Sequence, residues 1–199
     1  ASPGDEVLTT PWSMSATAMS ILRWGCIPKF IDIEDKTFSI NPDLVEKEIT
    51  SRTKAIMVTN LFGHPAHLRK LREIADRNKI YLIEDNAQSP LAKEFGQCSG
   101  TIGHIGVLSF NYHKHIHTGE GGCCLTNDKN LAERLQLLRN HGEAVIENDD
   151  KTNFTNIIGS NFRMTEIQAA IGLVQCEDIN KHISKRVEIA EFLSNQVLN

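Results

Sequence analysis

Asp85 and Lys114 are the residues of this sequence whose types and positions could carry covalent chemistry. Asp85 comes after the apolar run Tyr81–Ile83, and Lys114 lies in a polar segment beyond the next apolar run. A neutral lysine amine attacks a carbonyl to form a Schiff base, and a carboxylate is the natural partner of a pyridinium nitrogen, as in pyridoxal phosphate sites. Judged by spacing alone, such a pair is more often a salt bridge between a surface lysine and a strand-end acid.

The histidines around Lys114 offer a different chemistry. His113, His115 and His117 would share one face if this segment were a strand, which is the H-x-H arrangement of many metal sites. A metal-dependent hydrolase that uses His113 and His117 is therefore an alternative. In a loop, the three imidazoles would instead be scattered.

Two further segments could contact a ligand. Gly119, Gly121 and Gly122 could allow a close backbone approach to a ligand, although a tight turn that enters a strand is the commoner explanation. Asn161 and Arg163, just before an expected helix, could donate hydrogen bonds to an anion. A loop asparagine beside a solvated arginine would give the same sequence.

Short apolar runs alternate with amphipathic stretches, and these elements must position the polar residues. The expected strands are Val7–Thr10, Lys29–Ile33, Ala55–Thr59, Tyr81–Ile83, Ile105–Leu108 and Cys123–Thr126. The expected helices are Ala16–Trp24, Pro42–Ile49, His67–Asn78, Asp128–Leu138, Thr165–Val174 and Ile179–Leu198, with a loop over Gly142–Asn156. This alternation predicts an α/β fold of parallel strands, in which ligands bind beyond the carboxyl ends of the strands.

Two of the expected helices have a definite apolar face. One face of the His67–Asn78 helix carries Leu68, Leu71, Ile74 and Ala75. One face of the Asp128–Leu138 helix carries Leu131, Leu135 and Leu138. We expect these faces to pack against the sheet.

The composition narrows the class of protein. The 199 residues are 40% hydrophobic and 23% charged, which is typical of a globular domain, and the net charge of -4 argues against broad contacts with nucleic-acid phosphates. No apolar run approaches the roughly 18 residues of a membrane span, and residues 1–6 do not resemble a signal peptide. Five cysteines without a C-x-x-C motif favour reduced thiols and a cytoplasmic location.

Taken in order, these segments resemble the DegT/DnrJ/EryC1/StrS family of pyridoxal-phosphate-dependent sugar aminotransferases, within the fold-type-I aspartate aminotransferase superfamily. The resemblance covers nearly the whole chain and implies a three-layer α/β/α large domain with a mostly parallel sheet. The segments that carry it are Pro3–Val7, Ala16–Ala18, Gly25–Asp32, Asn60–Ala66, Glu84–Gln88, Ser109–Phe110 with Lys114, Gly119–Gly122, Arg139–Gly142 and Gly159–Met164.

The resemblance implies a role for each site residue. Lys114 matches the lysine that forms the Schiff base with pyridoxal phosphate and moves the proton, and Asp85 matches the acid that pairs with the pyridine nitrogen. Gln88 matches a residue near the phenolic oxygen of the ring. Ser109 matches a hydroxyl that binds the cofactor phosphate, and Asn161 matches an asparagine that reaches the phosphate of the partner subunit. A homodimer with shared active sites is therefore expected.

Two positions, Met14 and Lys114, need comparison with the usual family pattern. Met14 stands where the family usually has an aromatic residue stacked on the cofactor, and a methionine can pack on a ring through its sulfur and methyl groups. Relatives with histidine at the lysine position are dehydratases, so a pyridoxal-phosphate-dependent sugar dehydratase is an alternative. The spacing from Ser109 to Lys114 fits the aminotransferase register.

The resemblance also implies the reaction and the extent of the domain. The expected reaction moves an amino group from an amino acid, such as glutamate, to a keto-sugar that is usually nucleotide-linked, in cell-surface or lipopolysaccharide sugar biosynthesis. Family members are considerably longer than this chain. Residues 1–199 are therefore expected to be a partial cofactor-binding large domain, without the N-terminal phosphate-loop segment and the C-terminal small domain. An inactive fragment is the remaining alternative.

Overall fold

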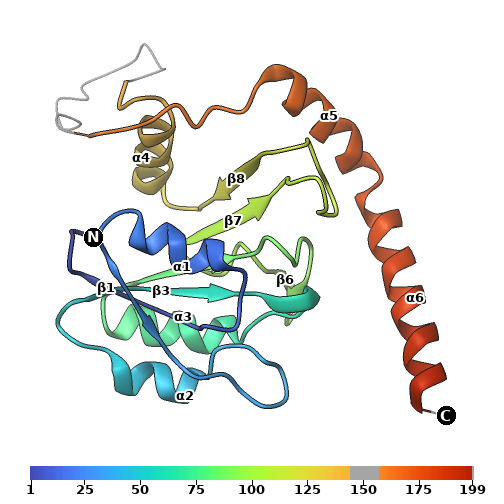
Figure 1. Ribbon diagram of the computed structural model, residues 1–199, viewed down its shortest axis with the longest axis horizontal. Helices are drawn as coiled ribbons and strands as arrows, with labels where there is room; N and C mark the ends of the chain where they lie inside the picture. The colour runs from blue at the N-terminus through green and yellow to red at the C-terminus, as the bar shows by residue number, and fades with distance from the viewer. Residues whose placement is uncertain (144–156, 199) are drawn as a thin grey trace. The chain divides into compact units, whose positions relative to one another are not determined.

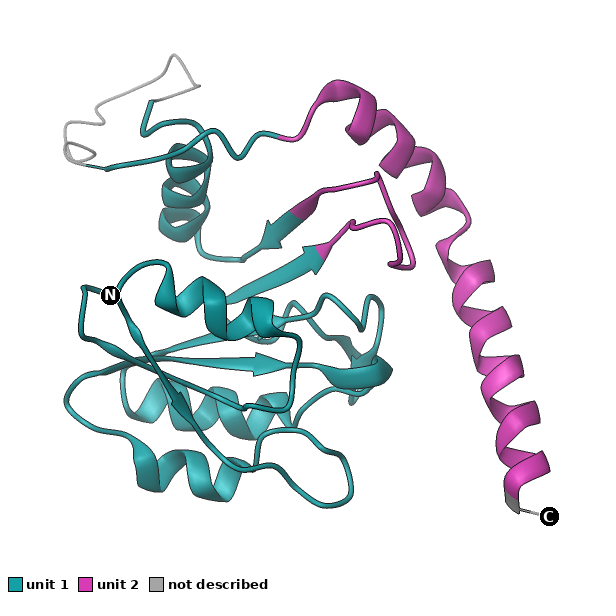
Figure 2. Ribbon diagram, viewed as in Figure 1, with its two compact units in different colours: residues 1–108, 123–163 teal, residues 109–122, 164–199 magenta. Residues whose placement is uncertain are grey.

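The computed structural model describes residues 1–143 and 157–198, which form two compact units (Figure 2). Unit 1 comprises Ala1–Leu108 and Cys123–Arg163, and unit 2 comprises Ser109–Gly122 and Met164–Asn199. The expected loop Gly142–Asn156 lies mostly outside the described residues. Each unit is described on its own.

A six-stranded sheet organises unit 1 (Figure 1). Its strands lie in the order β2-β1-β3-β4-β7-β8, and β1 pairs with β2 and β3, β3 with β4, and β4 with β7, all in parallel. The strands are β1 (Glu6–Thr9), β2 (Ile27–Phe30), β3 (Thr53–Thr59), β4 (Tyr81–Asp85), β7 (Ile105–Ser109) and β8 (Gly122–Leu125). The expected α/β class with a mostly parallel sheet is confirmed.

Helices cover both faces of this sheet. The helices of unit 1 are α1 (Ser15–Leu22), α2 (Pro42–Val45), α3 (Leu68–Arg77) and α4 (Lys129–Arg139), with short 3-10 turns η1 (Glu46–Glu48) and η2 (Leu61–Gly63). In unit 1, α1 lies on one face and α2 and α3 on the other (Figure 1). A two-stranded hairpin of β5 (Lys93–Glu94) and β6 (Gln97–Cys98) follows β4.

The strands contribute side chains to two apolar cores because successive side chains of a strand point to opposite faces of the sheet. Leu8 and Ile56 join the core with Leu71 of α3, whereas their neighbours Val7 and Ala55 join the core with Ile21 of α1. Burial of both faces explains why these strands read as continuous apolar runs. The expected apolar face of α3 is buried as the sequence predicts, with Leu68, Leu71, Ile74 and Ala75.

The expected helix Pro42–Ile49 is a short helix, α2, followed by the 3-10 turn η1. Three further expectations need correction. Strand β2 begins at Ile27 rather than at Lys29 and ends three residues earlier than expected, because this edge strand is only partly covered and has no apolar run to mark it. Strand β4 includes Glu84 and Asp85, which the apolar run did not reach. The buried residue of α4 is Leu137, while the expected face of Leu131, Leu135 and Leu138 is only half-buried.

Unit 2 consists of the segment 109–122 and the helices α5 (Glu166–Glu177) and α6 (Ile179–Leu198). Thr165 caps α5 through a capping box with Gln168, which confirms the expected start of this helix. Among the described residues, no helix combines the length and the apolar character that crossing a membrane requires.

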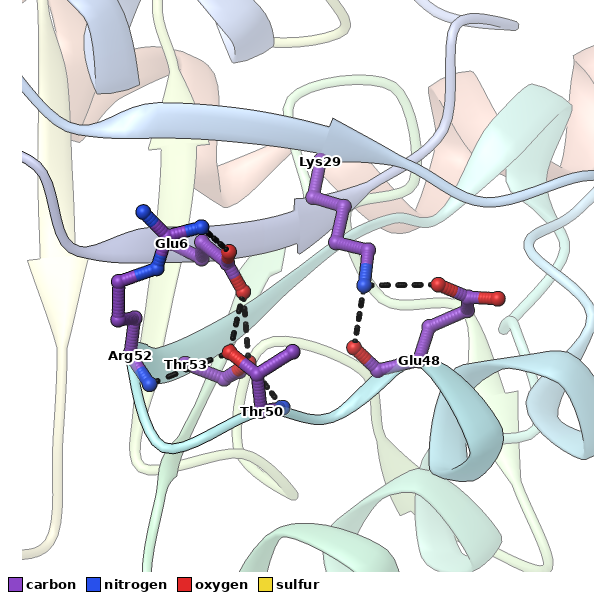
Figure 3. A network of polar contacts seen from close by, with 6 residues as sticks. All are labelled: Glu6, Lys29, Glu48, Thr50, Arg52 and Thr53. Atoms are coloured by element: carbon purple, nitrogen blue, oxygen red, sulfur yellow. Dashed lines mark hydrogen bonds and ion pairs between the residues drawn. The ribbon is translucent and has the colours of Figure 1, made fainter.

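A buried carboxylate ties the start of β1 to the turn before β3 (Figure 3). Glu6 is 5% exposed and accepts hydrogen bonds from Thr50 Oγ1 and Arg52 Nη2, both at 2.6 Å. Nearby, Lys29 bonds to Glu48. The hydrogen bond from Thr50 and then the charge of Arg52 lower the pKa of Glu6 from its ordinary value of 4.5, against the opposing effect of burial.

This lowered pKa predicts a pH-dependent contribution to stability. Because the pKa of Glu6 is lower in the folded than in the unfolded chain, its contribution is present above about pH 4.5 and disappears as the pH falls through the folded-state value. We expect Glu6→Gln to lower the free energy of unfolding at pH 7, and the difference from the unmodified protein to shrink below pH 4.5. Denaturant unfolding of both proteins at pH values from 7 to 3 measures this difference in the free energy of unfolding.

The matched control is Glu46→Gln, which breaks a surface ion pair with Arg77. This exposed pair should contribute little at any pH. Equal stability of Glu6→Gln and the unmodified protein at pH 7 would contradict the prediction.

Candidate active site

Asp85 lies at the carboxyl end of β4, directly opposite Thr59 at the end of β3. Its Oδ2 accepts a hydrogen bond from Thr17 Oγ1 at 2.7 Å, and its Oδ1 accepts one from the backbone N–H of Ala87 at 3.2 Å. Each carboxylate oxygen has two lone pairs, so acceptor capacity remains for a further N–H donor. The side chain is half-buried, as a group that must meet a ligand requires.

The preceding residue, Glu84, points to the opposite face of the sheet and is fully buried. Its carboxylate accepts the backbone N–H groups of Gly100, Ile102 and Gly103, at 2.5, 2.9 and 2.5 Å, and the side-chain amide of Asn60 at 3.2 Å. These bonds hold the loop that leads into β7 against the end of β4. Sequence reasoning gave Glu84 no role of its own, although an acid next to Asp85 in a strand must face the other side.

Buried amide and hydroxyl groups extend this network to the segment after Asp85. Asn86 Oδ1 accepts from Asn60 Nδ2 at 3.0 Å and from Ser99 Oγ at 2.8 Å, and Ser89 Oγ donates to the carbonyl of Asn60 at 2.6 Å. Gln88 lies between these anchored residues, and its Oε1 accepts from the N–H of Phe62 at 3.4 Å. The backbone that carries Asp85 and Gln88 is therefore fixed on both sides.

Met14 lies at the N-cap of α1 and is 64% exposed. Its sulfur accepts from the N–H of Ala16 at 3.0 Å, and its carbonyl accepts from the N–H of Thr17 at 3.2 Å. Since Thr17 bonds to Asp85, the expected residues Met14 and Asp85 are linked through one side chain. The exposed methionine surface is available for a planar ligand.

Asn161 lies beside Asn140, with which it forms an isolated antiparallel bridge. Arg163, the other expected anion contact, donates from Nη1 to Asn140 Oδ1 at 2.6 Å. The Oδ1 of Asn161 accepts from the N–H of Arg163 at 3.4 Å. Asn161 therefore keeps its side-chain N–H groups for other partners, whereas Arg163 is engaged within unit 1.

Lys114 and Ser109 lie together on the segment 109–122 of unit 2. The N–H of Lys114 donates to the carbonyl of Asn111 at 2.9 Å, which forms a turn, and Ser109 Oγ accepts from the N–H of Asn111 at 3.3 Å. The two ends of the segment are joined between Phe110 and Gly121 at 2.8 Å. Lys114 therefore lies in a loop whose two ends are held together by a backbone hydrogen bond.

One face of α5 holds this loop in place. Gln175 both donates to the carbonyl of His117 at 2.7 Å and accepts from its N–H at 2.9 Å, as a neighbouring strand would. One turn earlier, Gly172 leaves only 3.2 Å between an added Cβ and the methyl group of Thr118. Gln168 donates to the carbonyl of Glu120 at 2.9 Å. The spacing of 168, 172 and 175 is that of a single helical face.

The histidine segment does not have the geometry of a metal site. His113 lies in a turn, His115 in a bend and His117 in irregular backbone, so this segment is not the strand that the metal-site alternative requires. Within residues 1–143 and 157–198, no three His, Cys, Asp or Glu side chains gather in a way that could hold a metal ion. Burial lowers the pKa of His115, and the charges of Arg186 and Lys114 lower it further, which favours a neutral imidazole at pH 7.

The expected residues therefore fall into two groups. Unit 1 contains Asp85, Gln88, Met14 and Asn161, and the first three are connected through the end of β4 and the start of α1. Unit 2 contains Lys114 and Ser109. A carboxylate with spare acceptor capacity, an amine and a hydroxyl are the groups that a pyridine nitrogen, an aldehyde and a phosphate require. The chemical types of these groups fit pyridoxal phosphate, with the carboxylate in unit 1 and the amine and the hydroxyl in unit 2.

Comparison with known proteins agrees with this chemistry. The sequence model of the DegT/DnrJ/EryC1/StrS aminotransferase family matches residues 1–198. A GDP-perosamine synthase of Escherichia coli is 37% identical over 98% of this chain and 53% of its own length. The chain spans about half the length of such curated relatives.

Solved structures with the same fold include an aminotransferase and a dehydratase. An aminotransferase from Psychrobacter cryohalolentis superposes with a TM-score of 0.82 and 36% identity, over 89% of this chain and 47% of its own. An E. coli GDP-4-keto-6-deoxy-D-mannose-3-dehydratase with bound hydrated PLP superposes with a TM-score of 0.87 and 31% identity, over 100% of this chain and 55% of its own.

Proposed function

The chain belongs to the DegT/DnrJ/EryC1/StrS aminotransferase family, and on that premise we propose that it is the cofactor-binding part of a pyridoxal-phosphate-dependent sugar aminotransferase. The observation that carries the proposal is the family match over residues 1–198, with a lysine at 114 and a half-buried acid at 85 at the positions that the motifs require. Residues 1–199 are then part of the large domain, and the relatives, of which this chain covers about half, contain further residues.

In this proposal, each site residue has one task toward the cofactor. Pyridoxal phosphate supplies an aldehyde that bonds to amines and a ring that accepts electrons from the substrate carbon. Asp85 accepts the N–H of the protonated ring nitrogen through its free lone pairs. Lys114 would hold the cofactor through its Nζ, which condenses with the aldehyde and releases water, and as a free amine it would accept and return a proton at the substrate carbon.

The remaining residues bind and orient the ring. Ser109 donates its hydroxyl to the cofactor phosphate, and Asn161 donates its amide to the phosphate held by the partner subunit of a homodimer. Gln88, fixed between anchored neighbours, lies near the phenolic oxygen. Met14 packs its exposed sulfur and methyl group on the ring face.

The substrate class follows from the names of the relatives. A nucleotide-linked keto-sugar is the proposed acceptor, since two GDP-perosamine synthases are 37% and 38% identical to this chain. An amino acid such as glutamate is the proposed donor of the nitrogen, and the cytoplasm is the proposed location of the enzyme. Cell-surface or lipopolysaccharide sugars are the expected destination.

An isotope experiment tests the proposed reaction. The intact protein is incubated with pyridoxal phosphate, ¹⁵N-labelled glutamate and a GDP-linked 4-keto-6-deoxy sugar, and the sugar product is analysed by mass spectrometry. We expect one ¹⁵N atom in the product for each 2-oxoglutarate formed. A product that has lost water and gained no nitrogen would contradict the aminotransferase assignment.

A dehydratase is the second candidate, because a dehydratase structure superposes on the whole of this chain. It requires a histidine in place of the cofactor-binding lysine, and this chain has Lys114 at five residues after Ser109. The same mass-spectrometric assay separates the two reactions.

A further inference from the structure

We infer that the hydroxyl groups of Thr59, Ser13 and Thr17 form a directed hydrogen-bond relay that positions Asp85 for the nitrogen of the cofactor ring. The inference rests on the proposed function, since it assigns these three residues to the binding of the same ring. None of them carries a role in the sequence interpretation. Their hydroxyl groups come from three different places along the chain and meet at the carboxylate.

The carboxylate of Asp85, which can only accept, determines which hydroxyl is the donor in each hydrogen bond of the relay. A carboxylate without a proton only accepts, so the 2.7 Å contact between Thr17 Oγ1 and Asp85 Oδ2 uses the single proton of the Thr17 hydroxyl. The 3.0 Å contact between Ser13 Oγ and Thr17 Oγ1 must then use the proton of Ser13. The 3.1 Å contact between Ser13 Oγ and Thr59 Oγ1 must in turn use the proton of Thr59.

Burial makes this arrangement stable. Thr17 is 4% exposed and Thr59 is 2% exposed, so water cannot readily replace a lost partner of either hydroxyl. A buried hydroxyl without a hydrogen bond costs about 1–3 kcal/mol. Each hydroxyl donates toward Asp85 and accepts from the hydroxyl before it where there is one, and hydrogen bonds in such a chain strengthen one another in a low-dielectric environment.

The relay joins the elements that surround the ligand site of unit 1. Thr59 ends β3 beside Asp85 at the end of β4, Thr17 belongs to the first turn of α1, and Ser13 lies between β1 and α1. The bond from Thr17 occupies Asp85 Oδ2, while Ala87 contacts Oδ1. With both oxygens held, the carboxylate cannot rotate freely, and its remaining lone pairs keep one direction.

Binding of a cofactor analogue tests the relay without the catalytic reaction. The probe is 4'-deoxypyridoxine 5'-phosphate, which has the ring nitrogen and the phosphate but no aldehyde, so it cannot bond to Lys114. We expect Thr17→Val, which removes the donor and keeps the shape, to raise the dissociation constant about tenfold in the intact protein. Ser13→Ala and Thr59→Val should raise it by smaller factors, because each acts through Thr17.

Rescue and coupling distinguish positioning from a general structural defect. Thr17→Ser keeps the hydroxyl and should bind the probe as the unmodified protein does. The double variant Thr17→Val/Ser13→Ala should bind no worse than Thr17→Val alone, since Ser13 has no other route to Asp85. Ser20→Ala is the matched control, because its hydroxyl bonds to the Thr17 carbonyl and not to the relay.

The outcomes separate the relay from the proposed function. Failure of the unmodified protein to bind the probe would overturn both. Normal binding by the unmodified protein and equally tight binding by Thr17→Val would overturn the relay alone. Additive losses in the double variant would also overturn it. Should Thr17→Val unfold, the partly exposed Ser13→Ala carries the test, and its unchanged affinity would refute the relay.

Discussion

Replacement of Lys114 by alanine is expected to abolish the visible absorption band of the bound cofactor and to lower turnover by at least about a thousandfold. In the proposed site Lys114 supplies both the amine that bonds the aldehyde and the base that moves the proton, and alanine supplies neither. The loop that carries residue 114 is held through its backbone by Gln168 and Gln175, so the substitution leaves its framework intact. Absorption spectroscopy and a coupled 2-oxoglutarate assay measure the two effects.

The control for this prediction is a lysine with the same chemistry in a different place. Lys129, at the first turn of α4, has a side chain that is 90% exposed and only a distant contact with Glu133. Lys129→Ala should keep both the absorption band and the activity. A band that persists in Lys114→Ala would remove Lys114 from its proposed role.

Of the substitutions considered, Glu84→Gln is expected to cause the largest loss of stability, about 3–5 kcal/mol in the free energy of unfolding. Glu84 accepts four N–H donors at two oxygens, from Gly100, Ile102, Gly103 and Asn60. A glutamine offers one oxygen, and its amide N–H₂ group would face backbone N–H groups in a buried place. At least one of the donors would lose its hydrogen bond.

Denaturant unfolding at pH 7 measures this loss, with Glu73→Gln as the control. Glu73 lies on the exposed side of α3, and its substitution should change the free energy of unfolding by less than about 0.5 kcal/mol. A loss for Glu84→Gln as small as that of the control would show that the loop 99–103 is held by other contacts.

The sequence predicted those parts of the fold that depend on local patterns of residues. The period of apolar residues in α3 predicted its buried face, and the expected starts of α2 at Pro42 and of α5 at Thr165 agree with the structure to within one residue. The alternation of strands and helices predicted the parallel sheet. The predicted bounds of strand β2 were wrong because an edge strand lacks a continuous apolar run. The predicted face of α4 was wrong because it did not include the buried Leu137.

The surroundings of the site could not be read from the sequence, because they depend on contacts between distant positions. Thr17 lies 68 residues from Asp85 in the chain, and Ser13 lies 46 from Thr59. Hydroxyl residues at such separations carry no periodic signal, and only the closing of β1, β3 and β4 against α1 brings them together. The roles of Lys114, Asp85, Gln88, Ser109, Asn161 and Met14 toward the cofactor stay predictions.

Chemical mapping of the cofactor attachment tests the central assignment most directly. The intact protein is loaded with pyridoxal phosphate, reduced with borohydride, digested and analysed by tandem mass spectrometry. The account predicts a phosphopyridoxyl group on Lys114 at close to one per chain. Attachment at a different lysine, or stoichiometric binding of the cofactor with no covalent attachment, would contradict it.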